Sequence, residues 1–243
     1  MKEAPALTAW AEATLVTPDG GKEKLRRSLM AEHRLTVIVD GEPFAETVCT
    51  RKSLRQLVLG RLCTAGRIAS AAEVASLEFS ENEDRAEASL RPGAGRGETQ
   101  GREDRSAWGG GDIFRLAAYL KENMPLHDET LGTHGCLLMH RGEILCCCED
   151  MGRSGALDKA VGEALLRSLP LNECVLYTTG RVSAEIAQKA FTAGARVLAS
   201  RTLPTWEAVA LAKNLGMTLI GRAWEEQFEI YAQPETAGDA PGS

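Results

Sequence analysis

The sequence predicts an α/β protein in which helices cover the faces of a mixed sheet, and two observations carry this prediction. In the second half of the chain, short apolar runs alternate with stretches of about ten residues whose apolar positions recur at helical spacing. Strands separated by helices need crossover connections, which place the helices on the faces of a largely parallel sheet. The chain has 243 residues, of which 44% are hydrophobic, so it is long enough to bury such a core.

The first part of the chain predicts a smaller α+β region, which we assign to residues 1–80. Residues 34–49 form two apolar runs around Asp40-Gly41, a dipeptide typical of a β-hairpin turn. Ser53 is placed to cap a helix over residues 54–62, whose leucines and valine share one face.

Two segments carry little periodic pattern. Residues 1–30 are mixed in character and give no assignment. Residues 81–112 interleave glycine with charges of both signs and offer little apolar surface, so we expect a mobile loop there. This loop separates the N-terminal region from a second domain over residues 113–233, and the tail at 234–243 is expected to fray.

The second domain contains a central hairpin followed by alternating helices and strands. Its first apolar run turns at Arg141-Gly142 into a second run that ends on Glu149 and Asp150. The predicted strands cover residues 136–140, 143–148, 173–178, 195–199, 217–220 and 228–231, and the predicted helices cover 113–122, 156–166, 183–191 and 204–214.

Charge and cysteine usage exclude several classes of protein. The net charge of −6 argues against binding nucleic acid by phosphate neutralisation. We expect no signal peptide, because the N-terminus lacks a charged segment followed by an apolar one, and no membrane segment, because no run of about 18 apolar residues is present. Seven cysteines, an odd number that includes three in a row, do not resemble a disulfide framework. We therefore expect a cytoplasmic protein.

Three predicted strand-to-helix turns each supply an arginine and a hydroxyl. They span residues 149–154, 179–183 and 200–205. Amides at the start of a helix favour an anion, and a guanidinium can grip phosphate oxygens. If the crossovers place the three turns on one edge of the sheet, they form a site for a phosphorylated ligand, and Glu149 and Asp150 would suit the amino edge of a purine or pterin. The alternative is three structural caps with surface arginines.

Several blocks of the sequence resemble the formate dehydrogenase accessory sulfurtransferase family, FdhD. The blocks are EDMGRSGALDK, TGRVSAEIAQKAFTAGARVLAS, the PTWEAVALA helix, MTLIG with IYA, and LTVIVDGEPF with TRKSLRQLVLGRLCTAGRI near the N-terminus. The likeness spans about residues 34–75 and 113–232. It implies a C-terminal three-layer αβα domain of the cytidine-deaminase-like kind.

The resemblance also implies a function. Members of the family carry sulfur as a persulfide from a cysteine desulfurase to the molybdenum bis(molybdopterin guanine dinucleotide) cofactor of formate dehydrogenase, usually as homodimers, and GDP would mimic the cofactor. By motif, the implied cofactor-binding residues are Thr133, His134, Glu149, Asp150, Gly152, Arg153, Asp158, Lys159, Gly180, Arg181 and Ser183, with Arg222, Ala223, Trp224, Glu225, Glu226 and Gln227 in a late loop.

The chain departs from the family at the sulfur-carrying cysteines. The family places a C-G-x-C-G pair in the loop before the helix at residue 113, where this chain reads GREDRSAWGGGD. The catalytic thiol is therefore unknown, with Cys146, Cys147 and Cys148 as weak candidates. The alternative function is a non-catalytic carrier or chaperone that binds the cofactor without persulfide chemistry. We expect no metal site, since the H-x-E and P-C-x-x-C patterns of zinc deaminases are missing.

Overall fold

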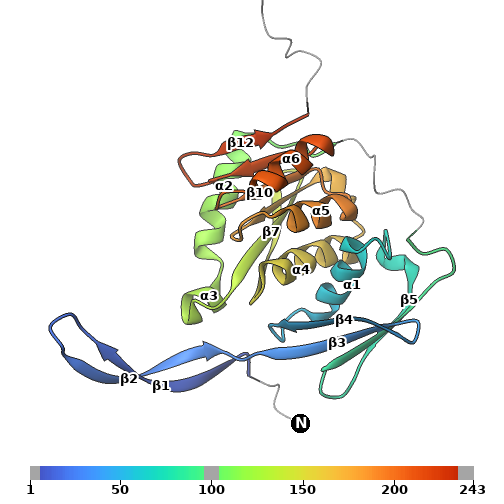
Figure 1. Cartoon of the computed structure of the whole chain (residues 1–243). Coiled ribbons are helices and arrows are strands. Elements are labelled where there is room, and N and C mark those ends of the chain that lie inside the picture. The colour runs from blue at the N-terminus through green and yellow to red at the C-terminus, as the bar shows by residue number, and fades with distance from the viewer. Residues whose placement is uncertain (1–5, 96–103, 235–243) are drawn as a thin grey trace, which may run out of the picture.

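A six-stranded mixed sheet forms the centre of the C-terminal half, with the strand order β12-β11-β10-β9-β7-β8 (Figure 1). This computed structural model describes residues 6–95 and 104–234. Strands β9, β10 and β11 run parallel, and β7 lies antiparallel to both β9 and β8, so β8 shares the direction of the parallel strands. The strands are β7 (His134–His140), β8 (Glu143–Asp150), β9 (Cys174–Thr178), β10 (Val197–Ser200), β11 (Thr218–Gly221) and β12 (Glu229–Ala232).

Helices cover both faces of this sheet. On one face, α4 (Arg153–Leu166), α5 (Ala184–Ala193) and α6 (Trp206–Asn214) share a single apolar cluster with the sheet. On the other face, α2 (Gly110–Glu122) buries Ile113 and Leu116 against a second cluster. The predicted three-layer αβα architecture is therefore confirmed.

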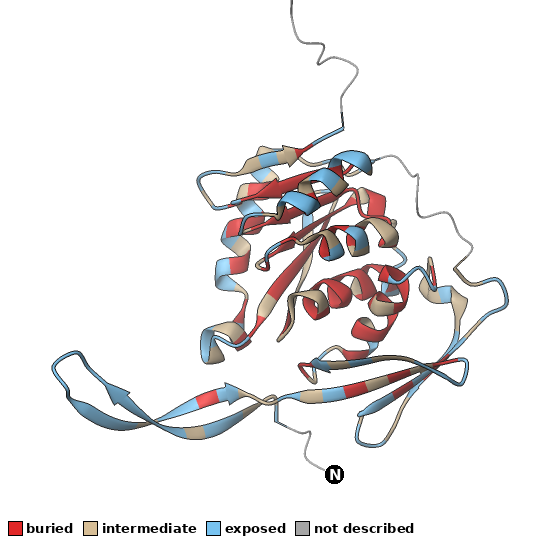
Figure 2. Ribbon diagram, viewed as in Figure 1, coloured by how far each residue is buried: buried red, intermediate tan, exposed pale blue. Residues whose placement is uncertain are grey.

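Burial explains the sequence of the central strands. All five residues of β9 (CVLYT) are buried because helices cover it on both faces, so it reads as a continuous apolar run (Figure 2). Strand β8, at the edge of the sheet, is only half-buried along most of its length.

The N-terminal region adds a four-stranded sheet in the order β4-β3-β6-β5, packed against helix α1 (Leu54–Thr64). The predicted hairpin is present, with Asp40 and Gly41 both at positive φ in its turn. The strands are β3 (His33–Val39), β4 (Glu42–Cys49), β5 (Val74–Phe79) and β6 (Arg85–Leu90).

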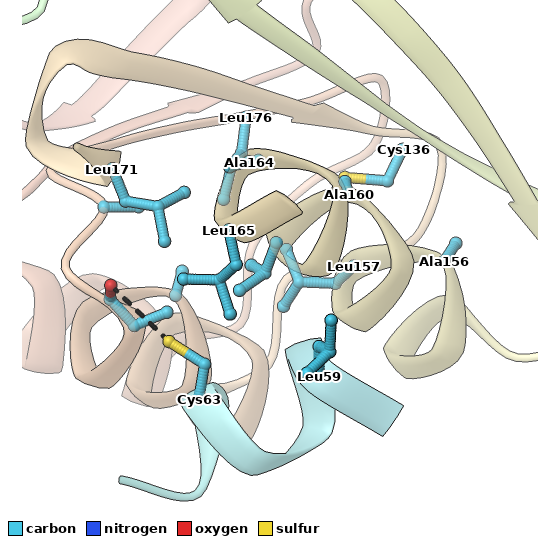
Figure 3. Packing of buried hydrophobic residues seen from close by; sticks show 14 of the residues in the cluster. Leu59, Cys63, Cys136, Ala156, Leu157, Ala160, Ala164, Leu165, Leu171 and Leu176 are labelled. Atoms are coloured by element: carbon cyan, nitrogen blue, oxygen red, sulfur yellow. Dashed lines mark hydrogen bonds between the residues drawn. The ribbon is translucent and has the colours of Figure 1, made fainter. Parts of the chain in front are cut away.

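Helices α1 and α4 join the two halves of the molecule. Their buried residues belong to one apolar cluster that also includes residues of β3 and β9. Figure 3 shows Leu59 and Cys63 of α1 facing Leu157 and Leu165 of α4 across this core. The N-terminal region is thus fixed to the three-layer domain by direct packing.

The structure corrects the description of the weakly patterned segments. Residues 8–30 form a hairpin of β1 (Thr8–Val16) and β2 (Lys22–Met30), which we call the arm; it projects from the body and is largely exposed (Figures 1 and 2). The prediction of a loop over residues 81–112 is wrong in its first part, because residues 85–90 form β6, which pairs with β3 and β5. Residues 96–103 of that loop and 235–243 of the tail lie outside the described residues.

Two local expectations also need correction. Ser53 precedes α1 as predicted, but it adopts a left-handed conformation with φ 57° and its side chain makes no capping hydrogen bond. A short helix, α3 (Pro125–Thr130), follows α2 and was not predicted. Proline at its first turn is compatible with a helix start, since that N–H needs no intrahelical partner.

Candidate anion-binding rim

One edge of the six-stranded sheet gathers the three predicted strand-to-helix turns. Strands β8, β9, β10 and β11 all end at this edge, and β7 begins there. The register aligns His134 with Asp150, and Thr178 with Ser200. We call this edge the rim; it is where α/β sheets commonly bind ligands, beyond the carboxyl ends of the parallel strands.

The start of α4 differs from the starts of α5 and α6. Ser183 accepts a hydrogen bond from the Ile186 amide, and Thr205 accepts one from the Ala208 amide, so both of those helices are capped by a side chain. Helix α4 begins after Gly152 with no side-chain cap and no acidic residue in its first turn. The Asp150 carboxylate lies beside this helix start and accepts a hydrogen bond from the Gly152 amide, while the amides of the first turn that follow Gly152 have no side-chain cap and can receive an anion.

Close packing ties the turns of the rim together. A Cβ atom on Gly180 would lie 2.5 Å from the Cβ of Arg153, so the turn after β9 can approach the start of α4 only with glycine at this position. The Ser200 hydroxyl donates to the Gly180 carbonyl at 2.9 Å, and the Thr202 amide donates to Ser200 Oγ at 3.0 Å.

Arg153, at the start of α4, and Arg181, on the turn that precedes α5, have no acidic partner within the described part of the chain. Arg153 is half-buried and Arg181 is exposed, and neither forms an ion pair there. By contrast, Arg222 pairs with Glu229 at 3.0 Å. Arg153, the first residue of α4, adds its positive charge to this end of the helix.

His134 begins β7 at the same rim, opposite Asp150. Its Nδ1 atom is 3.2 Å from Thr179 Oγ1. Burial lowers the pKa of His134, and the nearby charges of Arg153 and His127 lower it further, against an opposing effect of Asp150. At neutral pH the imidazole is therefore uncharged.

Glu149 is turned into the protein, contrary to the expectation that it would recognise a base. Its carboxylate is buried and accepts hydrogen bonds from the amides of Leu126 and His127, at 3.2 and 2.8 Å, and from the Thr133 hydroxyl at 2.9 Å. Glu149 thereby caps α3 from β8, which is distant in the sequence. Thr133 helps to hold the Glu149 carboxylate in this position.

Asp150 is likewise turned into the protein. It is fully buried and pairs with Lys159 Nζ at 2.6 Å, while accepting hydrogen bonds from the amides of Thr50 and Gly152. Lys159, which is also buried, donates to the Glu149 and Thr50 carbonyls. This pair fixes the loop that starts α4.

Asp158, another residue implied by the resemblance, joins three helices. Its buried carboxylate pairs with Arg61 of α1 at 2.5 Å and with Lys189 of α5 at 2.8 Å, and accepts from Thr64 at 2.8 Å. Glu149, Asp150, Asp158 and Lys159 thus support the rim, whereas His134, Gly152, Arg153, Gly180 and Arg181 form it.

The late loop borders a hollow at the end of the rim. Trp224 stacks under the guanidinium of Arg201 at 4.3 Å, and Ala223 is buried, its carbonyl accepting the Tyr177 hydroxyl. The hollow measures about 850 Å³ and is lined by Lys121, Arg201, Thr202, Leu203, Arg222, Trp224, Glu225, Glu226 and Gln227. Arg153 and Arg181 lie further along the same edge.

Sequence reasoning missed the part played by Lys121. It reaches the late loop from α2 and pairs with Glu225 at 3.5 Å. No local pattern links residues so far apart in the chain. Arg201 was recognised as part of a turn, but its stacking on Trp224 depends on the order of the strands.

These features place the chain in the class of three-layer αβα proteins. The chain belongs to the FdhD/NarQ family, whose model matches residues 30–111 and 98–237. No helix in the described ranges is both long and apolar enough to span a membrane.

Individual relatives agree with the family assignment. The chain is 31% identical over 234 residues to a sulfur carrier protein FdhD of Staphylococcus haemolyticus, covering 86% of this chain and 89% of the relative. It is 28% identical over 233 residues to that of Shouchella clausii, covering 84% and 87%. A crystal structure described as a formate dehydrogenase accessory protein of Desulfotalea psychrophila shares the fold, with a TM-score of 0.84, 24% identity, and coverage of 95% of this chain and 99% of that one.

Proposed function

We propose that this protein carries sulfur for the maturation of a formate dehydrogenase. The observation that carries the proposal is membership of the FdhD/NarQ family. The similar members are named sulfur carrier proteins, and this chain matches them over 87% and 89% of their length. Sulfur carrying is favoured over a binding-only role for the same reason.

The substrate that fits the rim is a molybdenum cofactor carrying guanine dinucleotides. The uncapped start of α4, with Arg153 and Arg181 beside it, supplies amides and guanidiniums for a diphosphate. The hollow beside Trp224 and Arg201 offers a stacked, cationic wall for a flat ring system. Support comes from this combination of charge, open amides and close backbone approach at Gly180.

The arm supports a homodimer. Directly paired residues of a hairpin lie on the same face, so Ala9, Ala13 and Leu15 share one face with Leu25 and Leu29. Glu23, opposite Leu15, and Arg27, opposite Ala11, are the charged residues of this otherwise apolar face. Leu15 and Leu29 are 43% and 48% exposed. An isolated two-stranded hairpin is marginally stable in water, so this apolar face is suited to a second copy of the chain. The sulfur donor we propose is a cysteine desulfurase, in the cytoplasm, where thiols stay reduced.

The proposal is tested in cells that lack their own accessory protein but produce its formate dehydrogenase. We expect this chain to restore formate oxidation, and Arg153→Ala to reduce the restored activity. The matched control is Arg141→Ala, which removes an exposed arginine from the β7–β8 turn at the opposite edge of the sheet. Failure of the wild-type chain, produced in folded form with its cognate enzyme, would contradict the proposed function.

A further inference from the structure

A sulfur carrier needs a thiol, and the segment before α2 has none. The sequence contains no cysteine between Cys63 and Cys136. All seven cysteines lie among the described residues, none forms a disulfide, and Cys49, Cys63, Cys136 and Cys174 are buried. The remaining three, Cys146, Cys147 and Cys148, lie half-buried on β8.

Two of these thiols form a close pair. The sulfur atoms of Cys146 and Cys148 are 3.7 Å apart, with Cys148 donating to Cys146. Residues two apart on a strand share a face, and both of these pack on the side of α4, whereas Cys147 packs on the side of α2. Because β8 is the last strand on its side of the sheet, the pair lies along an edge of the domain.

The electrostatics distinguish Cys146 from the other cysteines. The hydrogen bond from Cys148 is the main cause of a lowered Cys146 pKa, opposed by burial and by Glu163, while Arg167 lowers it further. Glu163 and Arg167 face the pair from α4 and bind each other at 2.8 Å. Burial raises the pKa of Cys147 to about 12.

The pKa values of the remaining cysteines are also raised, as is that of Cys147. The hydrogen bond to Cys146 and burial raise the pKa of Cys148 well above its ordinary value. Burial raises the pKa of Cys136 well above its ordinary value and the pKa values of Cys49, Cys63 and Cys174 to about 12. The thiolate is the nucleophile in sulfur transfer, and Cys146 combines partial exposure with a neighbouring thiol that donates a hydrogen bond to its sulfur.

We propose that Cys146 is the thiol that carries sulfur in this protein and that Cys148 is its positioning residue, which holds the Cys146 sulfur by hydrogen bonding. This inference rests on the proposed function. The Cys146 thiolate attacks the outer sulfur of a donor persulfide, R–S–SH. A new S–S bond forms on Cys146, the donor S–S bond breaks, and the donor leaves as a thiolate, so that R–S–SH and Cys146–S⁻ give R–S⁻ and Cys146–S–SH. No external oxidant or reductant is needed.

The position of the pair suits transfer to the rim. Cys146 lies four residues before Asp150 on the same strand, which corresponds to about 13 Å along β8. The donor would approach β8 from the side, where no further strand follows it. A ligand on the rim would lie beyond the carboxyl end of the same strand. Donor and acceptor would therefore approach from different sides of one strand.

The test loads the full-length, reduced protein with inorganic polysulfide for a short time and then alkylates it. Trypsin releases residues 142–153 as one peptide that contains all three cysteines, so substitutions assign the sulfur. We expect one added sulfur atom on this peptide in the wild-type protein. In Cys146→Ser the fraction of peptide that carries the added sulfur should fall at least about tenfold, and in the control Cys147→Ser it should stay the same.

The role of Cys148 is tested by the pH profile of loading. Cys148→Ala is expected to move the midpoint for loading upward in pH, and Cys148→Ser, which retains a hydroxyl donor, to restore part of the shift. Equal melting temperatures show that the variants are folded. A midpoint that is unchanged in folded Cys148→Ala would contradict the positioning role.

The maturation assay separates this inference from the proposed function. We expect Cys146→Ser to lose the restored formate oxidation and Cys147→Ser to keep it. If wild type and Cys146→Ser mature the enzyme equally, or if sulfur is found on another peptide, the assignment of Cys146 is wrong while the proposed function stands. If wild type fails to mature the enzyme, the proposed function is wrong whatever the loading shows.

Discussion

Gly60 on α1 lies directly against the carbonyl oxygen of Asp158 on α4. A Cβ atom built on Gly60 would lie 1.7 Å from that oxygen, and a Cβ on Gly162 would lie 1.9 Å from the carbonyl oxygen of Gln56. The two helix backbones are therefore in contact at two glycines. This contact allows Arg61 to reach the buried carboxylate of Asp158, joining the N-terminal region to the three-layer domain.

We expect Gly60→Ala to lower the free energy of unfolding by at least about 2 kcal/mol, because the methyl group overlaps backbone atoms that cannot move aside. Urea denaturation followed by circular dichroism measures the change. The control is Gly111→Ala in α2, where the added methyl has open space and alanine should stabilise the helix by about 0.5–1 kcal/mol. Equal effects at the two glycines would show that α1 and α4 are not in backbone contact.

The sequence indicates α1 and α4 but not their closeness. The apolar spacing of residues 54–62 and 156–166 predicts both helices. In the structure, burial extends beyond one face, since all residues from 155 to 162 of α4 are buried. Helical glycines carry no pattern that identifies a partner, so the crossing at Gly60 and Gly162 depends on tertiary packing. Strand β6 was missed for another reason: its buried residues, Ala86 and Ala88, are small and favour helices as isolated residues.

We expect Lys159→Met to reduce the free energy of unfolding by about 3–5 kcal/mol, because it leaves the Asp150 carboxylate buried without its cation. Chemical denaturation at pH 7 measures the loss. Lys121→Met is the control, since its ion pair with Glu225 is largely exposed and should contribute less than about 1 kcal/mol. Similar losses for both lysines would contradict a structural role for the buried pair.

We expect Leu15→Asp to dissociate a dimer held by the apolar face of the arm, because a carboxylate would be buried there without a partner. Sedimentation velocity across a range of protein concentrations measures the association. The neighbouring Val16→Asp is the control: Val16 is 60% exposed and points to the charged face, where it pairs with Lys22. Association that survives Leu15→Asp, or that is lost equally in both variants, would exclude this face as the dimer contact.

Anion binding at the rim should depend on the charge of His134. Because the pKa of His134 is lowered from 6.5, the imidazole is neutral at pH 7. It adds positive charge only as the pH falls below 6.5. We expect the GDP affinity of wild type relative to His134→Asn to stay constant between pH 8 and 7 and to rise on acidification. Taking this ratio removes the protonation of the phosphate itself, whose second pKa is about 6. A ratio that changes chiefly above pH 7 would contradict the assignment.

The candidate site was predictable in outline because crossover connections fix where parallel strands end. The turns that carry Arg153, Arg181 and Thr202 follow strands β8, β9 and β10, so strand order alone brings them to one edge. The hydrogen-bond partners of the charged side chains at the end of a strand are not fixed in this way. Glu149 and Asp150 point inward because the α3 amides and Lys159, which are remote in the chain or on the next helix, supply their partners.

The most direct test of the rim is calorimetric titration with GDP and with guanosine. We expect GDP to bind and guanosine to bind far more weakly, since the diphosphate contacts the α4 amides and the two unpaired arginines. Arg181→Ala should weaken GDP binding by about ten- to a hundredfold, the loss of one hydrogen bond to a charged group, while Arg141→Ala leaves it unchanged. Equal affinities for GDP and guanosine, or a GDP affinity indifferent to Arg181→Ala, would contradict the claim that this edge of the sheet holds a diphosphate.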